Sequence, residues 1–182
     1  MISLRVISGK YKGKIIKGYD IEGTRPTMDR VKESVFSTIQ NYIPDSVVLD
    51  LFSGSGNLGI EAISNGSKTC YFVDNNKIAV NTIKDNTKTI NEEYHILNLD
   101  YKDALNKFDR DNIKFDLIFL DPPYRFNYID SIIEFALEKG LLNKDGLIVC
   151  EIENDINTLY DDLDLYREKK YGNKKVIIFK KK

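Results

Sequence analysis

The feature that most constrains the fold is a regular alternation of strand-like and helix-like segments that begins at Val47. The strand-like runs are "VVLDL", "KTCYFVD", "YHILNLD", "FDLIFLD" and "GLIVCEI", with helix-like segments between them. Such an alternation predicts an α/β fold in which a mainly parallel sheet carries helices on both faces. Because ligands of these sheets bind where the strands end, the residues after each run are the candidates for function.

Both ends of the chain depart from this alternation. The segment "LRVISGKYKGKIIKGY" predicts a small β-hairpin whose connection runs from Gly9 to Gly13. A helix follows, with Thr27 as its expected N-cap. The C-terminal segment "LYREKKYGNKKVIIFKKK" predicts a second hairpin with a Gly-Asn turn.

Two helices have an apolar stripe at helical spacing. In the first, the stripe is Met28, Val31, Val35, Ile39 and Tyr42. In the helix "NKIAVNTIKDNTKTI", the residues expected to face the sheet are Ile78, Ile83 and Ile90, with Val80 and Thr87 beside them.

The length of 182 residues predicts one domain over 1–182, with 1–24 as a hairpin extension of it. Cys70 and Cys150 lie in apolar runs and are expected to be buried, reduced thiols. No apolar run approaches the roughly 18–20 residues of a membrane span. The N-terminus has no apolar signal core, so we expect a cytoplasmic protein without a membrane partner.

The net charge of −1 conceals a strong separation of charge along the chain. Residues 1–19 carry +5, residues 169–182 carry +7, and residues 20–168 carry −13. Two basic ends around an acidic body fit a polyanion bound to part of the surface. The alternative is that these lysines are only solvated, in a chain that is rich in lysine throughout.

The first strand-like run leads into the glycine loop "LDLFSGSGNLGIE". Gly54, Gly56 and Gly59 match the spacing of a dinucleotide motif, so an NAD enzyme is one alternative. Asp50 argues against it, because a carboxylate beside the loop would repel a pyrophosphate. Asp74 ends the second run and can accept from ribose hydroxyls.

The third run is followed by Asp100 and Asp103, of which Asp103 is the preferred partner for an adenine amino group. Each of these acids alone is as well explained as a helix N-cap. Acids at four successive strand ends favour a pocket for an adenosine with a positive tail, S-adenosylmethionine. The expected cofactor-binding residues are Asp50, Phe52, Ser53, Gly54, Ser55, Gly56, Asp74, Asn75, Asp103 and Ala104.

The fourth run ends in an unusual corner, "DPPY". Pro122 and Pro123 fix the backbone and remove N–H donors, so the corner is stiff and rich in acceptors. The Asp121 carboxylate and the Pro122 carbonyl can accept the two hydrogens of a nucleobase amino group, and Tyr124 can stack on the base. The expected catalytic residues are therefore Asp121, Pro122, Pro123 and Tyr124. This chemistry needs no metal, and His95 is expected to be structural.

Taken together, "DLFSGSGNLGIE", "DPPY", "RVISGKYKGKII" and "RPTMDRVKESVF" resemble the RsmD-like family of bacterial 16S rRNA guanine-N2 methyltransferases, within the class I S-adenosylmethionine-dependent amino methyltransferases. The resemblance implies a Rossmann-like, seven-stranded sheet with a C-terminal reversed hairpin. It implies methylation of guanine N2 in 16S rRNA, free or within the small ribosomal subunit. Asp74 departs from the Glu that is frequent in the family.

The resemblance also places RNA phosphates on the N-terminal hairpin, and a monomer is the default expectation. The expected RNA-binding residues are Arg5, Lys10, Lys12, Lys14, Arg25 and Arg30. Ion pairs with acids such as Glu33 explain Arg25 and Arg30 equally well. Two other functions stay open: an adenine-N6 methyltransferase of DNA or RNA, which uses a similar corner, and a non-catalytic nucleotide-binding protein.

Overall fold

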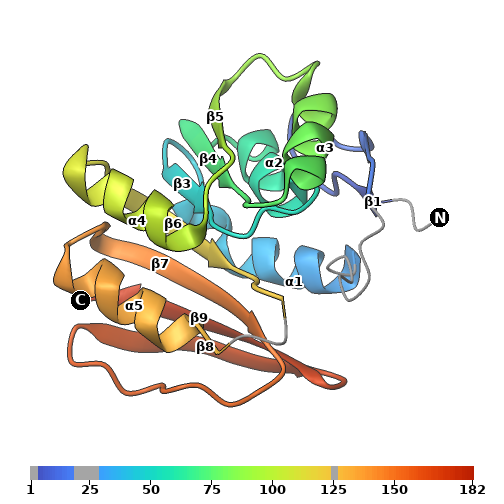
Figure 1. Ribbon diagram of the computed structural model, residues 1–182. Helices are drawn as coiled ribbons and strands as arrows, with labels where there is room; N and C mark the ends of the chain where they lie inside the picture. Colours follow the sequence, from blue (N-terminus) through green and yellow to red (C-terminus); the bar gives the residue numbers. More distant parts are fainter. Residues whose placement is uncertain (1–3, 19–28, 124–126) are drawn as a thin grey trace.

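A seven-stranded sheet forms the centre of the computed structural model, which describes residues 4–18, 29–123 and 127–182 (Figure 1). The strand order is β5-β4-β3-β6-β7-β9-β8. The strands from β5 to β7 are parallel, and β9 is antiparallel to both of its neighbours. The strands are β3 (Val47–Asp50), β4 (Thr69–Val73), β5 (Glu93–Leu97), β6 (Phe115–Leu120), β7 (Leu142–Ile152), β8 (Leu163–Tyr171) and β9 (Lys174–Lys181).

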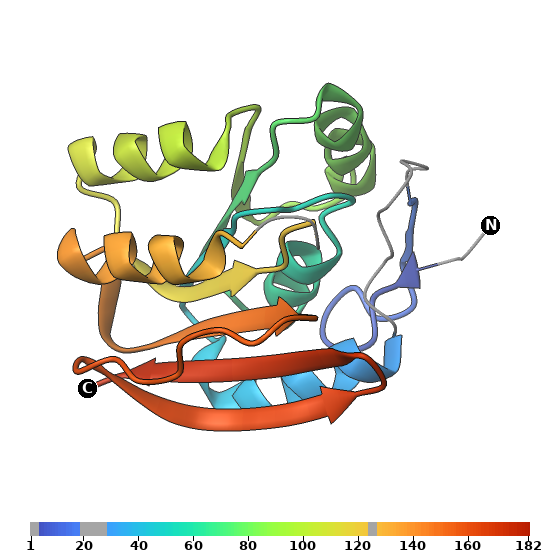
Figure 2. The same cartoon turned by 60° about the horizontal axis from the view of Figure 1, so that its bottom comes forward.

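Helices cover both faces of this sheet, as predicted (Figure 2). One core cluster joins the sheet to α1 (Asp29–Ile39), α2 (Asn57–Ser64) and α3 (Lys77–Thr87). The other joins it to α4 (Tyr101–Arg110) and α5 (Ile129–Glu138). Cys70 and Cys150 are buried free thiols, one in each cluster, as expected.

The two hairpins also form where the sequence predicts them. β1 (Leu4–Arg5) pairs with β2 (Ile15–Ile16) in a separate two-stranded sheet. β8 and β9 are joined through Gly172 and Asn173. The short η1 (Gln40–Tyr42) follows α1, while the predicted N-cap Thr27 and the first residue of the stripe, Met28, lie outside the described residues.

One prediction about α3 is wrong. Ile83 and Ile90 are buried, together with Val80 and Thr87, but the side chain of Ile78 is 61% exposed. Ile78 precedes Ile83 by five residues, so the two side chains lie about 140° apart around the helix. Its backbone N–H donates to the capping Asn76 side chain. The face toward the sheet begins instead at Ala79, four residues before Ile83, which is fully buried.

A buried ion pair fixes the N-terminal hairpin against the rest of the molecule. The Lys32 ammonium of α1 lies 3.0 Å from the Glu61 carboxylate of α2, and both side chains are fully buried. Lys32 also donates to the carbonyl of Arg5 and to the side chain of Asn57. Glu61 in turn accepts from the backbone N–H groups of Ile7 and Ser8. The pair therefore joins β1, α1 and the start of α2.

A search for membrane-spanning helices among the described residues finds none that is both long and apolar enough.

Candidate active site

The candidate site lies where the order of the parallel strands reverses across the sheet. From β3 the strands proceed to β4 and β5 on one side, and β6 then pairs with β3 on the other. In that register Asp50 is opposite Phe119, and Leu51 donates its N–H to the Phe119 carbonyl. Asp121 therefore follows its strand directly beside the start of the glycine loop. This is the switch point at which open α/β sheets bind ligands.

The glycine loop is a tight turn held by its own backbone and by Ser53. Gly54 and Gly56 have φ angles of 56° and 82°, in the left-handed region that only glycine adopts readily. Gly56 precedes the first residue of α2 and donates its N–H to the Ser53 carbonyl. Ser53 is also tied to β4, because its hydroxyl accepts from the Val73 N–H. The loop therefore presents backbone at the end of the central strand.

The third glycine serves the packing of α2. A Cβ at Gly59 would lie 2.3 Å from the Phe72 ring and 2.8 Å from Cys70 Sγ. The helix thus approaches β4 more closely than any side chain would allow. Ser55, the other loop serine, accepts from the Asn86 amide through its carbonyl.

Asp74 connects the glycine loop to the end of β4. Its Oδ2 accepts from the Gly54 N–H at 2.9 Å, and its Oδ1 accepts from the Asn76 N–H at 2.9 Å. Burial raises the pKa of Asp74, and these two hydrogen bonds oppose the rise. The half-buried carboxylate retains lone pairs toward the strand ends, and the adjacent Asn75 is exposed.

Asp50 is more deeply buried than a ligand-facing acid would be. Its side chain accepts from the Gly59 N–H at 3.0 Å, and the residue is 2% exposed. Burial, with a smaller contribution from the nearby Asp74, raises its pKa to about 7 against the opposing hydrogen bond from Gly59. An acid that is only partly ionised at neutral pH repels a pyrophosphate weakly. The charge of Asp50 is therefore a weaker argument against NAD than the sequence suggested.

The two acids that follow β5 have different environments. Asp100 is the N-cap of α4 and accepts from the Lys102 N–H at 2.9 Å, which is the structural role that the sequence left open. Asp103 is exposed in the first turn of α4, and Ala104 is fully buried beneath it. Asp103 remains the predicted partner of an adenine amino group.

The acceptor corner follows β6 as expected. Asp121 is half-buried, Pro122 is buried and Pro123 is exposed. Tyr124, the residue predicted to stack on the base, lies outside the described residues. The described part of the corner thus leaves a carboxylate and backbone carbonyls at the end of the strand next to the glycine loop.

An aromatic cluster joins Phe52, which the sequence predicted as a site residue, to two tyrosines that it did not. Phe52, in the glycine loop, packs against Tyr101 with ring centroids 5.7 Å apart. Tyr101 stacks on Tyr128 at 4.8 Å, and Tyr128 begins the turn into α5. Phe52 and Tyr101 follow β3 and β5, and Tyr128 is the N-cap of α5, so the available signal was an aromatic residue in each of these connections. The rings form an apolar cluster next to the glycine loop, to which Phe52 belongs.

Three of the five described cations that were predicted to bind RNA have partners in the protein. Arg5 lies 3.5 Å from Asp29, Lys10 lies 2.5 Å from Glu92, and Lys14 donates to the Thr89 hydroxyl. Lys12 and Arg30 are exposed and have no ion pair among the described residues, so the proposed Arg30–Glu33 pair is absent there. Arg25 lies outside the described part of the chain.

Two further observations concern side chains with metal-binding or catalytic potential. Within the described ranges, no group of three or more His, Cys, Asp and Glu residues could hold a metal ion. His95 lies within β5, stacks on Tyr71 at 4.4 Å and approaches Glu93 at 3.1 Å.

The sheet order, the reversed hairpin and the glycine loop together define the fold of the class I methyltransferases. A family model described as "Conserved hypothetical protein 95" matches residues 4–180. The chain belongs to this family, the RsmD family.

Two curated relatives and one solved structure illustrate the similarity. YlbH of Bacillus subtilis is 39% identical over 98% of this chain and all of its own length. Ribosomal RNA small subunit methyltransferase D of Haemophilus influenzae is 37% identical over 84% of this chain and 80% of its own. The solved structure of yhhF from Escherichia coli superposes with a TM-score of 0.88 and 26% identity, covering 99% of this chain and 98% of the other.

Proposed function

We propose that this protein transfers a methyl group from S-adenosylmethionine to the exocyclic N2 amino group of a guanine in 16S rRNA. Support comes from membership of the RsmD family and from relatives named as methyltransferases of the small-subunit ribosomal RNA. The proposal places the enzyme in the cytoplasm as a monomer, with rRNA or a small-subunit particle as its partner.

The observation that carries the proposal is the adjacency of two strand ends. The glycine loop follows β3, and the acceptor corner follows β6, the strand paired with it. A methyl donor bound at the loop would therefore lie beside an amino group held at Asp121. Methyl transfer requires this adjacency, because the attacking nitrogen and the methyl carbon must meet in line.

The residues of the loop fit the cofactor. Gly54 and Gly56 bring backbone close to a ligand, and the half-buried Asp74 offers acceptors for ribose hydroxyls. Phe52 and Asn75 flank this position, while Asp103 is proposed to reach the adenine amino group. When bound, S-adenosylmethionine supplies an electrophilic methyl group on a positively charged sulfur.

The acceptor corner activates the guanine by orientation. The lone pair of N2 is delocalised into the ring, so the nitrogen is a poor nucleophile. The Asp121 carboxylate and the Pro122 carbonyl accept its two N–H hydrogens and direct the remaining electron density toward the methyl group. The same acceptors stabilise the positive charge that grows on N2 during transfer, and the surplus proton then leaves to water.

Nucleoside mass spectrometry tests the proposal directly. Ribosomal RNA from cells that lack this protein should lose one N2-methylguanosine from 16S rRNA, and the purified protein with S-adenosylmethionine should restore it. An unchanged nucleoside profile would contradict the proposal.

The same acid-Pro-Pro corner also occurs in adenine-N6 methyltransferases, and a parallel assay separates that alternative. The purified protein is given small ribosomal subunits, free 16S rRNA and duplex DNA. Transfer to guanine in either ribosomal substrate is expected. Transfer to adenine alone, in DNA or RNA, would establish the alternative instead.

A further inference from the structure

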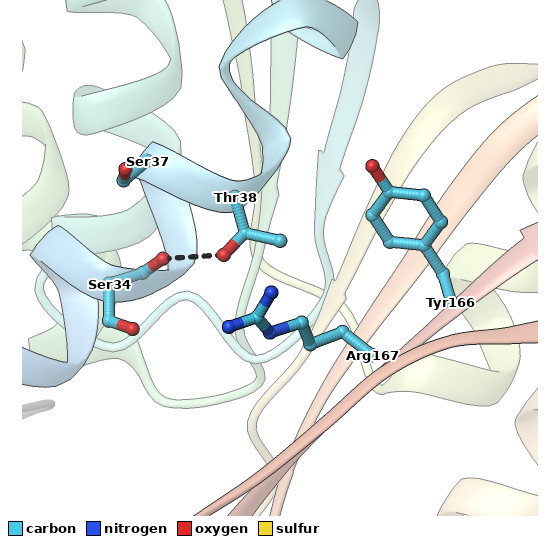
Figure 3. A pocket seen from close by; sticks show the side chains of 5 residues that line it. All are labelled: Ser34, Ser37, Thr38, Tyr166 and Arg167. Atoms are coloured by element: carbon cyan, nitrogen blue, oxygen red, sulfur yellow. Dashed lines mark hydrogen bonds between the residues drawn. The ribbon is translucent and has the colours of Figure 1, made fainter.

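A polar hollow of about 580 Å³ opens between α1 and the edge strand β8. It is lined by Ser34, Ser37, Thr38, Tyr166 and Arg167. Figure 3 shows the guanidinium end of Arg167 reaching toward the Ser34 and Thr38 side of the helix, with Tyr166 on the far side of the hollow. The lining thus combines hydroxyl groups with a permanent positive charge.

The register of the terminal hairpin explains why cationic side chains face α1. Arg167 and Lys169 pair with Ile178 and Val176, which belong to the core cluster under α1. Lys169 accordingly donates to the Ser34 hydroxyl at 3.2 Å, and Tyr171 donates to it at 2.6 Å. The cations of β8 therefore project into the space beside the helix.

The hollow keeps its positive charge because the nearby acids are directed elsewhere. Among the described residues, no carboxylate pairs with Arg167 or Lys169. Glu168, which lies between them in sequence, pairs with Lys175 at 2.9 Å on the opposite face of the hairpin. Arg30 is exposed one helical turn before Ser34 and extends the cationic surface along α1.

The same register relates the hollow to the acceptor corner. Phe119 pairs with Val149, Val149 with Ile178, and Ile178 with Arg167. Lys169 is therefore level with the position that Asp121 occupies just beyond β6. Three strand spacings, about 14 Å, separate the two, a distance that a few nucleotides can span.

We propose that the α1–β8 hollow binds the RNA backbone a few nucleotides away from the target base. Arg167 would hold a phosphate through paired N–H donors, with Lys169 as a second charge. The hydroxyls of Ser34, Ser37 and Thr38 supply further donors of the kind that position a nucleic-acid backbone. This inference rests on the proposed function, because it assigns the substrate of the same active site a second point of contact.

A double variant tests the contribution of charge. Arg167→Gln with Lys169→Gln should weaken binding of small-subunit rRNA about four- to fivefold per cation at 0.15 M salt, and should make the log–log salt slope shallower by about 0.7–0.9 per cation. KM for RNA should rise, while kcat and the affinity for S-adenosylhomocysteine stay at the wild-type values. The matched control is Lys68→Gln with Lys114→Gln, two exposed lysines at the amino ends of β4 and β6, and it should leave RNA binding unchanged.

Photo-crosslinking gives a reading that does not depend on removing charge. A photoreactive amino acid in place of the exposed Ser37 should crosslink to 16S rRNA close to the methylated guanine. Crosslinking only to a ribosomal protein, or to no component, would overturn the inference. So would a double variant with the wild-type KM and salt slope, or a control pair with an equal loss.

The wild-type enzyme distinguishes the two proposals. The wild-type enzyme can methylate rRNA while the Arg167 and Lys169 double variant keeps the wild-type KM and the Ser37 position gives no rRNA crosslink. In that case only the inference about the hollow is rejected. If the wild-type enzyme methylates no rRNA, the proposed function fails first.

Discussion

At the scale of single residues, two aspartates at neighbouring strand ends have different environments. Asp50 is buried and bonded to the backbone of α2, whereas Asp121 is half-buried at the corner that follows β6. The sequence presented both as acids that follow an apolar run. Burial distinguishes the acid that is hydrogen-bonded to α2 from the acid that we propose to hold the substrate amino group.

The burial of Asp50 predicts a specific dependence of stability on pH. Its pKa is about 7 in the folded protein and about 4 when unfolded, so the folded state binds the proton more tightly. The free energy of unfolding should therefore fall as pH rises from about 4 to about 7, by a few kcal/mol. Asp50→Asn should remove this contribution, and urea unfolding between pH 4 and pH 8 would measure it. An equal decline in the variant would show that Asp50 is not responsible.

At the scale of secondary-structure elements, close packing of α2 on β4 depends on Gly59. A Cβ there would approach Phe72 and Cys70 within van der Waals distance, so Gly59→Ala should destabilise the fold by about 1–3 kcal/mol. The matched control is Gly18→Ala, where an added Cβ meets nothing within 4 Å. Thermal unfolding of both variants measures the difference, and equal midpoints would contradict the packing argument.

The buried ion pair gives a second prediction at this scale. Lys32→Met leaves the Glu61 carboxylate buried without its cation and should cost about 3–5 kcal/mol. Adding Glu61→Gln should recover part of the loss, because the buried charge is then gone as well. Chemical denaturation measures both, with the exposed Lys68→Met as the control. A single variant as stable as wild type would mean that the pair does not hold the hairpin in place.

The elements also show what the sequence could and could not predict. Hydrophobic periodicity and turn residues were sufficient to predict the alternating strands and helices and both hairpins. The capping role of Asp100 depends on where the preceding strand ends, which no local pattern specifies. The exposure of Ile78 follows from its position about 140° around the helix from Ile83, which a strict helical period would have shown. Lys32 was unremarkable in the sequence, because its buried partner Glu61 is 29 residues away on another helix.

At the scale of the whole molecule, the two basic ends of the chain differ in how their cationic side chains are paired. Two cations of the N-terminal hairpin, Arg5 and Lys10, pair with acids, while in β8 Arg167 lines a polar hollow and Lys169 donates to Ser34 beside it. Charge counted along the sequence located both segments. The strand register and the ion pairs determine which of these two segments presents unpaired positive charge to a binding partner.

The proposed catalytic site is also formed only at this scale, since its parts come from strand ends about 70 residues apart in the sequence. The most direct test of the account is methyl transfer to small ribosomal subunits by Asp121→Ala, measured beside the affinity for S-adenosylhomocysteine. We expect cofactor affinity to stay within about twofold and kcat to fall by about a hundredfold or more. Methyl transfer at the wild-type rate would contradict the role assigned to the corner after β6.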